Sequence, residues 1–255
     1  MELLITFLIV CPLSALAGFV DAIAGGGGLI SLPAFFMAGL PAHTAIATNK
    51  LSSTMGTTLA TVRLAMKGFL KPRLVAGPVV AGLTGSAIGA SLNLLINDDV
   101  LRIIMLVVLP LTALYLVRPH SMEESDTRLS FGKTLVISIA IALFIGMYDG
   151  FYGPGTGTFL LLLLTGVAKM TLGDAAGTTK AINLSTNIAA LVVFLVNGQV
   201  YILLGLIAGA CNMIGNYIGV NLFSSKGTKI VKPIMLCVIG IFLVKTLLEV
   251  LGVTV

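Results

Sequence analysis

The chain has 255 residues, of which 57% are hydrophobic and 10% are charged, with a formal net charge of +5 and a mean hydropathy of +1.09. Soluble domains carry about 25% charged residues, so this composition excludes an ordinary soluble protein and predicts an all-α polytopic membrane protein surrounded by the lipid bilayer. The basic residues lie in short loops rather than in one patch, which argues against a nucleic-acid partner.

Apolar segments of about 20 residues predict membrane-spanning helices. Ten helical elements are predicted, at 3–24, 28–41, 44–66, 74–96, 100–117, 133–152, 157–168, 176–197, 200–223 and 230–251. A polar stretch divides them, so the chain separates into a first transmembrane repeat (1–117), a polar cytoplasmic linker (118–132) and a second transmembrane repeat (133–255). The second and seventh elements are too short to span comfortably and are predicted to be half-length or re-entrant helices.

Glycine-rich stretches follow the first and sixth elements. Four consecutive glycines fill 25–28, and Gly-Pro-Gly-Thr-Gly fills 153–157. Each glycine costs about 1 kcal/mol of helix propensity, and irregular backbone at membrane depth persists only where protein or a water-filled cavity covers it. We therefore expect broken helices that line an internal site, with exposed N–H groups that attract anions. The candidate glycines are Gly25, Gly26, Gly27, Gly153 and Gly155.

The two halves match each other in sequence. At an offset of 128 residues, Asp21 aligns with Asp149, and one glycine before Asp21 and two after it also align with glycines. At an offset of 130, Lys50 aligns with Lys180. Equivalent loops carry different charge: the loop after 44–66 is basic, and its counterpart after 176–197 is uncharged. Because short cytoplasmic loops are rich in Lys and Arg, we expect two inverted-topology repeats of about five elements each, with both termini on the outer side. Inverted repeats with broken helices are typical of secondary transporters.

Four ionisable residues lie in symmetric pairs within or at the edge of apolar elements. For Asp21 and Asp149, a helix cap bonded to glycine amides competes with a proton-coupling or gating role. For Lys50 and Lys180, a lysine that snorkels from a helix end competes with an anion ligand. Charges at membrane depth are costly and usually face a cavity. The neighbours of the lysines favour the anion ligand, because ammonium supplies charge and neutral donors supply geometry. These neighbours include Asn49, Ser53, Thr179 and Asn183.

No metal or cofactor signature accompanies these residues. The two histidines, His43 and His120, are isolated, and the three cysteines show no pairing or metal spacing. The glycine stretch 25–28 lacks the flanking residues of a nucleotide-binding loop. We therefore expect no metal, no cofactor and no ATP-driven pumping.

The segment 18–33, followed by Ala-Thr-Asn-Lys-Leu at 47–51, resembles the TauE/SafE family, also described as sulfite exporters, and so does 148–157. The similarity covers nearly the whole chain and is greatest to a bacterial inner-membrane branch, which implies a multi-pass protein of the bacterial inner membrane. It further implies a permease for small sulfur-containing anions such as sulfite or an organosulfonate, with Asn49, Lys50, Thr179 and Lys180 near the substrate path. Asn49 meets Thr179 and Gly26 meets Pro154, so the two half-sites are not equivalent and one central substrate is expected.

The resulting hypothesis is a secondary transporter of a small anion that works by alternating access, and not an enzyme. A passive anion channel is one alternative. An intramembrane aspartyl hydrolase that uses Asp21 and Asp149 is another, although its usual Gly-x-Gly-Asp motif is missing. The sequence leaves proton coupling and a homo-oligomer open.

Overall fold

The computed structural model describes residues 2–117 and 129–221. Every regular element in these ranges is an α-helix, which confirms the all-α prediction for the described residues. The helices are α1 (Glu2–Ala24), α2 (Gly28–Met37), α3 (Ala42–Met66), α4 (Pro72–Leu94), α5 (Asp98–Val117), α6 (Phe131–Phe151), α7 (Thr156–Gly166), α8 (Leu172–Val196) and α9 (Ile202–Asn221). The predicted element at 230–251 and most of the linker lie outside the described residues. The last two residues assigned to the linker belong to α6.

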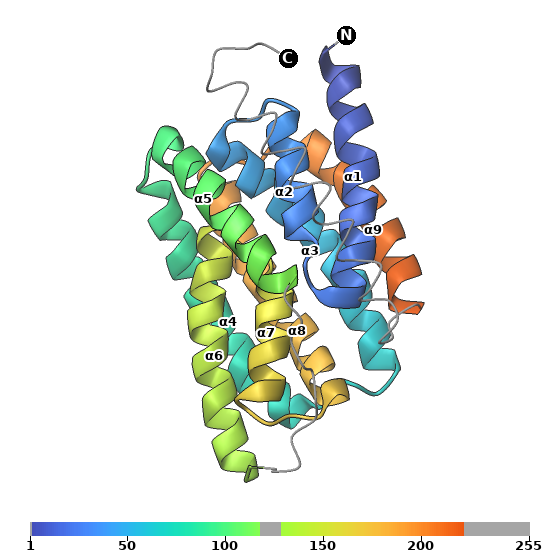
Figure 1. Cartoon of the computed structure of the whole chain (residues 1–255), viewed down its shortest axis with the longest axis vertical. Coiled ribbons are helices and arrows are strands. Elements are labelled where there is room, and N and C mark those ends of the chain that lie inside the picture. Colours follow the sequence, from blue (N-terminus) through green and yellow to red (C-terminus); the bar gives the residue numbers. More distant parts are fainter. Residues whose placement is uncertain (1, 118–128, 222–255) are drawn as a thin grey trace.

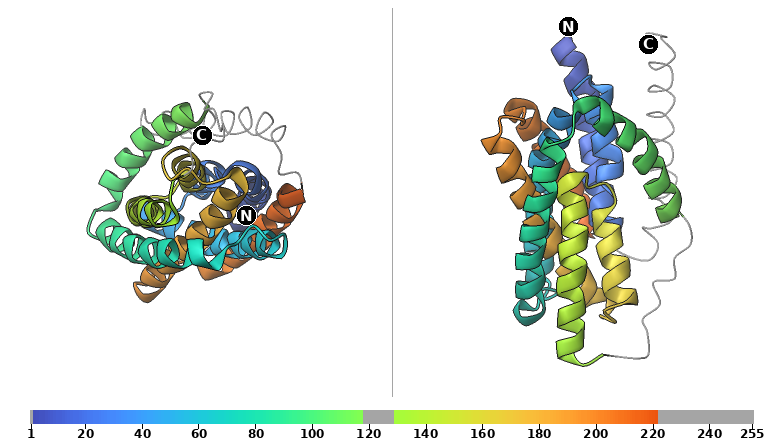
Figure 2. Two further views of the ribbon diagram at one scale, coloured as in Figure 1. Left: turned by 90° about the horizontal axis from the view of Figure 1, so that it is seen from below. Right: turned by 90° about the vertical axis from the view of Figure 1, so that its left-hand side faces the viewer.

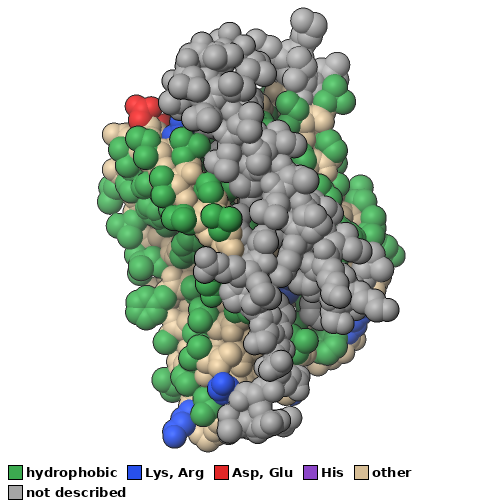
Figure 3. All heavy atoms as spheres, viewed as in Figure 1, with side chains coloured by type: hydrophobic (Ala, Val, Ile, Leu, Met, Phe, Trp, Pro, Cys, Tyr) green, Lys and Arg blue, Asp and Glu red, His purple; other side chains and the backbone are tan. Residues whose placement is uncertain are grey.

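Five described helices are long and apolar enough to cross a membrane, namely α1, α4, α6, α8 and α9. Helices α2 and α7 have only 10 and 11 residues, as predicted for the short second and seventh elements. Large apolar side chains such as Val136 and Phe144 are about two-thirds exposed, at 67% and 65%. Figure 3 shows such side chains over the described surface, with acidic groups at one end beside a basic group and further basic groups toward the other end. This distribution suits a protein that lies in lipid between two aqueous phases.

The long helices pack in the order α6, α4, α8, α3, α9, α1, and each contacts the next. The short helices lie beside this series: α2 contacts α1 and α3, and α7 contacts α6 and α8. Helices at equivalent places in the two halves, such as α1 and α6, run in opposite directions along the long axis (Figures 1 and 2). Helices of the two halves therefore pack against each other, as α4 does against α6 and α1 against α9. The inverted placement of the halves in a membrane stays a prediction.

Glycines set the closest helix contacts. A Cβ at Gly85 of α4 would overlap the carbonyl oxygen of Leu143 in α6, and one at Gly215 of α9 would overlap the carbonyl oxygen of Ala15 in α1. Small residues let helix backbones approach in this way, so that van der Waals packing can hold them in lipid. The pairs α4–α6 and α1–α9 are consequently fixed at short range. They lie on either side of α3 and α8, which carry Lys50 and Lys180.

Two helical hairpins meet near the middle of the molecule. The chain reverses between α1 and α2 at Gly25, where φ is +74°, and between α6 and α7 at Gly153, where φ is +100°. Both values lie in the left-handed region that side chains disfavour. Gly25 also packs directly against the backbone of Gly157, so the tip of one hairpin touches the tip of the other. The predicted helix breaks are confirmed, and they bring the ends of α1 and α6 to the same region (Figure 1).

Candidate functional site

Two buried ion pairs cross between the halves of the chain. Lys50 of α3 pairs with Asp149 of α6, with Nζ 2.9 Å from Oδ2, and Lys180 of α8 pairs with Asp21 of α1, with Nζ 2.6 Å from Oδ2. The four side chains are those that the sequence repeat placed in symmetric positions. Each lysine therefore meets the aspartate of the opposite half, at the point where a broken helix ends.

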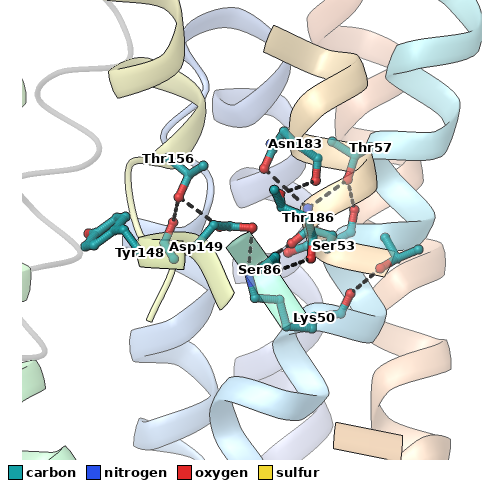
Figure 4. A network of polar contacts seen from close by, with 12 residues as sticks. Lys50, Ser53, Thr57, Ser86, Tyr148, Asp149, Thr156, Asn183 and Thr186 are labelled. Atoms are coloured by element: carbon teal, nitrogen blue, oxygen red, sulfur yellow. Dashed lines mark hydrogen bonds and ion pairs between the residues drawn. The ribbon is translucent and has the colours of Figure 1, made fainter. Parts of the chain in front are cut away.

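The Lys50–Asp149 pair is the more deeply buried of the two, and each side chain is 3% exposed. Asp149 Oδ1 accepts a hydrogen bond of 2.8 Å from the Thr156 hydroxyl, at the first residue of α7. Lys50 Nζ donates to Asn187 Oδ1 of α8 at 3.2 Å. Figure 4 shows Asp149 between the Thr156 hydroxyl and the Lys50 ammonium. Three helices and one hairpin tip therefore converge on a single pair of charges.

The Gly153 turn leaves room for this pair. A Cβ at Gly153 would come within 3.0 Å of both Asp149 Oδ1 and Lys50 Nζ. The same turn lets the Thr156 hydroxyl reach back to the main-chain oxygen of Gly153 at 2.7 Å, in addition to Asp149. The glycine that the sequence marked as a helix break thus has a second role, because it makes space for two charged side chains.

The Lys180–Asp21 pair has a different environment. Lys180 Nζ donates to both the carboxylate and the main-chain oxygen of Asp21, each at 2.6 Å. That main-chain oxygen also accepts the Gly25 N–H at 2.9 Å, and it lies in the last turn of α1, where the helix dipole favours a cation. Lys180 therefore closes the end of α1 as well as neutralising Asp21.

A cavity of about 30 Å³ lies between the hairpin tips and α3, α8 and α9. This volume is large enough for water-sized groups. Its lining is polar, and glycine backbone, amides and hydroxyls dominate it. The lining residues are Asp21, Gly25, Gly27, Gly28, Asn49, Lys50, Ser53, Thr57, Asp149, Gly153, Gly155, Thr156, Gly157, Asn183, Asn187 and Asn212.

Most of the residues singled out in the sequence meet at this cavity. Gly26, Thr179 and Lys180 do not line it: Gly26 is buried in the hairpin tip, and the other two line a smaller neighbouring pocket of about 20 Å³. Their side of the site is mostly apolar, with Ile23, Leu64 and Leu161 among its lining. The two lysines thus face different surroundings, as the unequal half-sites of the sequence led us to expect.

The site residues that the sequence did not single out are neutral. Asn187 links the halves, because its Nδ2 donates to Thr57 Oγ1 of α3 at 3.3 Å and its Oδ1 accepts from Lys50. Asn212 of α9 also lines the cavity, and Asn216 donates to its Oδ1 at 2.8 Å. Two asparagines one turn apart in an otherwise apolar helix were an available signal, because polar groups at membrane depth usually face the protein interior.

The arrangement provides charge and neutral donors for a small anion, and it gives each aspartate a lysine partner. A carboxylate dyad that shares one proton needs two adjacent carboxyl groups, whereas here each carboxylate lies against an ammonium group. A polytopic helical bundle with a charged, glycine-lined cavity between its halves defines a membrane transporter as the class of protein.

The comparisons with known proteins identify the family. The family model described as "Sulfite exporter TauE/SafE" matches residues 10–246. The chain is 34% identical to "Probable membrane transporter protein ORF9" of Sinorhizobium sp over 92% of its own length and 89% of that protein. It is 32% identical to "Probable membrane transporter protein YfcA" of Escherichia coli over 92% of its length and 87% of that protein. A "Probable membrane transporter protein" of Haemophilus influenzae is 31% identical over 86% of both chains.

The chain belongs to the TauE/SafE sulfite exporter family, and it is a multi-pass membrane transporter of the bacterial inner-membrane type. The family and its relatives indicate a transporter rather than an enzyme. No solved structure matches the chain.

Proposed function

We propose that the chain is a secondary transporter of a small sulfur-containing anion, such as sulfite or an organosulfonate, that works by alternating access. The sulfur-containing substrate class comes from the family description, which names sulfite. The observation that carries the proposal is the pair of buried Lys–Asp contacts that join the two halves across the polar cavity. Lys50 supplies positive charge for the anion inside the cavity, and Asp149 holds it when no anion is present. Lys180 adds positive charge beside the cavity, where it pairs with Asp21.

The position of these contacts supports alternating access. The hairpin tips α1–α2 and α6–α7 approach the cavity from opposite ends of the molecule (Figure 1), so a movement of one tip opens the cavity toward one end only. Gly25 of one tip packs against Gly157 of the other, so such a movement separates the two tips. Breaking and remaking ion pairs between the halves gives each movement a defined end state.

The electrostatics are adequate for binding. An ion pair at about 4 Å contributes about 4 kcal/mol at an effective dielectric constant of about 20, which offsets part of the dehydration of an anion. The amides and hydroxyls that line the cavity supply neutral hydrogen bonds without adding competing charge.

A thermal-stability screen of the detergent-purified protein tests the proposal. The panel contains sulfite, thiosulfate, sulfoacetate, taurine, sulfate and simple carboxylates, each tested on wild type and on Lys50→Gln/Lys180→Gln. An anion at about 100 times its dissociation constant adds about 2.7 kcal/mol of stability. We expect a sulfur anion to stabilise wild type and not the double variant. Stabilisation of both proteins alike, or by carboxylates alone, would contradict the assignment.

A flux assay separates the transporter from a passive anion channel. In proteoliposomes, alternating access gives saturable uptake and exchange of labelled anion against unlabelled anion inside. A channel gives flux that rises in proportion to the gradient, and unlabelled anion inside does not accelerate the uptake of label, as it does in alternating access.

A further inference from the structure

We propose that the Asp149 carboxylate occupies the position on Lys50 that the substrate anion takes, so that each monovalent anion enters the site together with one proton, which Asp149 binds. This inference rests on the proposed function, because it names the ligand lysine, the competing carboxylate and the coupling ion of the same site. It fixes the stoichiometry at one proton per anion, and it gives the two lysines different roles, because Lys50 exchanges its partner and Lys180 does not.

The first step of the argument is the charge balance around Lys50. Its ammonium contacts one carboxylate, at 2.9 Å, and one neutral amide, Asn187, at 3.2 Å. The lysine and Asp149 are both 97% buried, so their charges cancel within a volume that excludes bulk water. A monovalent anion that entered with Asp149 still ionised would leave one uncompensated negative charge in this volume, which is strongly unfavourable.

Protonation of Asp149 removes this excess charge. The ammonium–carboxylate pair separates, the carboxylate takes up one proton, and the anion pairs with the ammonium. The site is therefore neutral before binding, with one ammonium and one carboxylate, and neutral after binding, with one ammonium, one neutral carboxyl group and one anion. The Thr156 hydroxyl, 2.8 Å from Oδ1, can still donate to the neutral carboxyl group. Asn49 lines the same cavity, and its Oδ1 has no hydrogen-bond partner among the described residues, so the site contains an unused acceptor.

The second step is that only one of the two pairs is suited to this exchange. Lys180 lies outside the polar cavity, in a pocket with a mostly apolar lining. It donates to Asp21 Oδ2 and to the Asp21 main-chain oxygen at the end of α1. Releasing Asp21 would therefore also leave a helix terminus without its cation. Lys50 makes no such helix-end contact in the described structure, and amides from α8 and α9 share its cavity. The exchange is thus assigned to Lys50 and Asp149, and Lys180–Asp21 is the fixed pair.

The remaining titratable groups near Asp149 do not replace it in this role. From α3 the group is Lys50, from α8 it is Lys180, and from α1 it is Asp21, which the Lys180 contact neutralises. On α6 itself Tyr148 donates its hydroxyl to the main-chain oxygen of Pro154 at 2.7 Å, and the Tyr152 side chain is buried. Helix α4 brings Ser86 and the neutral amide of Asn93 to the end of α6, and α7 brings Thr156; none of these side chains titrates.

Binding of methanesulfonate, whose charge stays at −1 across the accessible pH range, tests the exchange directly. Its affinity is measured by thermal stabilisation at pH 8 and pH 6 for wild type, Asp149→Asn and the control Asp174→Asn, whose partner Lys71 has a side chain that is 58% exposed. Proton uptake on binding raises the wild-type affinity by up to about tenfold for each unit that the pH falls. Asp149→Asn, which leaves Lys50 free of its carboxylate, is expected to bind with less than about a twofold change. Asp174→Asn changes a carboxylate that does not line the cavity, so it is expected to keep the wild-type pH dependence.

Three outcomes of this experiment overturn the inference. The first is wild-type affinity that does not change with pH, the second is an unchanged pH dependence in Asp149→Asn, and the third is loss of binding in Asp149→Asn. None of these outcomes contradicts the proposed function where sulfur anions still stabilise wild type. The proposed function fails on a different result, which is that no sulfur anion stabilises the wild-type protein at either pH.

A flux measurement on wild type keeps the inference testable where Asp149→Asn does not fold. Proteoliposomes with a pH-sensitive dye inside receive a methanesulfonate gradient, with the membrane potential clamped by potassium and valinomycin. One proton per anion predicts acidification of the lumen in step with uptake, and an uptake rate that the potential does not change. Saturable uptake without acidification, or uptake driven by the potential, overturns the inference and leaves the transporter assignment intact.

Discussion

Lys180 Nζ lies 2.6 Å from both the carboxylate and the main-chain oxygen of Asp21, so a lysine of the second half holds the end of the first helix. Lys180→Met leaves the Asp21 carboxylate, whose side chain is only 15% exposed, without its cation. Breaking one partner of a buried pair costs about 3–5 kcal/mol, and we expect that loss in unfolding measured in mixed micelles. Lys180→Met/Asp21→Asn removes the isolated charge and should recover part of the lost unfolding free energy. A double variant less stable than Lys180→Met would contradict this explanation.

The exposed pair Lys71–Asp174 provides a matched comparison. Its Nζ–Oδ1 distance is 2.8 Å, close to those of the buried pairs, but the Lys71 side chain is 58% exposed. Solvent-exposed pairs contribute about 0–1 kcal/mol and weaken with salt. Lys71→Met should therefore lower the unfolding free energy by no more than about 1 kcal/mol, and less at high salt. A cost equal to that of Lys180→Met would show that burial does not set the difference.

The contact between the hairpin tips predicts a strong effect of Gly25→Ala. Gly25 has φ +74°, and a Cβ there would lie 2.7 Å from the Thr158 nitrogen and closer still to Gly157. Gly39 has a similar φ, +82°, but nothing lies within 4 Å of the added Cβ. Gly39→Ala should thus cost only the backbone strain, about 1 kcal/mol, and keep transport. Gly25→Ala should cost more and abolish transport. Equal thermal stability and flux in the two variants would exclude a specific role for the tip contact.

The α4–α6 interface gives a second glycine comparison. A Cβ at Gly85 would overlap the carbonyl oxygen of Leu143, whereas a Cβ at Gly132, in the first turn of α6, would meet nothing within 4 Å. Gly132→Ala should raise the unfolding free energy by about 0.4–1 kcal/mol, because alanine restricts the unfolded chain. Gly85→Ala restricts the unfolded chain in the same way, but its Cβ must push α4 and α6 apart, so we expect its net effect on the unfolding free energy to be destabilising. Stabilisation by both substitutions would show that the close approach of α4 and α6 is not required.

The sequence predicted the elements well where composition alone decides them. Long apolar segments form helices. The glycine stretches form the chain reversals at Gly25 and Gly153, because each glycine lowers the stability of a helix that contains it. Predicted boundaries moved by a few residues, as at the start of α8, Leu172 rather than 176. There Thr171 accepts a hydrogen bond from the Asp174 nitrogen, which adds a capped polar first turn that an apolar pattern does not mark.

The pairing within the site was not predictable from the pattern. The internal repeat marked two lysines and two aspartates, but the partners come from opposite halves, and tertiary packing alone decides which carboxylate each ammonium meets. The repeat also conceals a difference in the backbone. Gly27 is helical, with φ −55°, whereas its counterpart Gly155 is left-handed, with φ +84°. Pro154, in place of Gly26, fixes the preceding φ and removes a backbone donor, so matched glycines have different conformations.

The inverted placement of the halves predicts opposite accessibility at two equivalent positions. Lys67 follows α3 and Asn197 follows α8, both are exposed, and they match at the offset of 130 residues. Each is changed to cysteine in a variant that lacks Cys11, Cys211 and Cys237, and an impermeant thiol reagent is added to intact cells or to inside-out vesicles. Because the basic loop is expected to be cytoplasmic, Asn197→Cys should react in intact cells and Lys67→Cys only in inside-out vesicles. Reaction of both from one side would require an even number of crossings between them and exclude inverted halves.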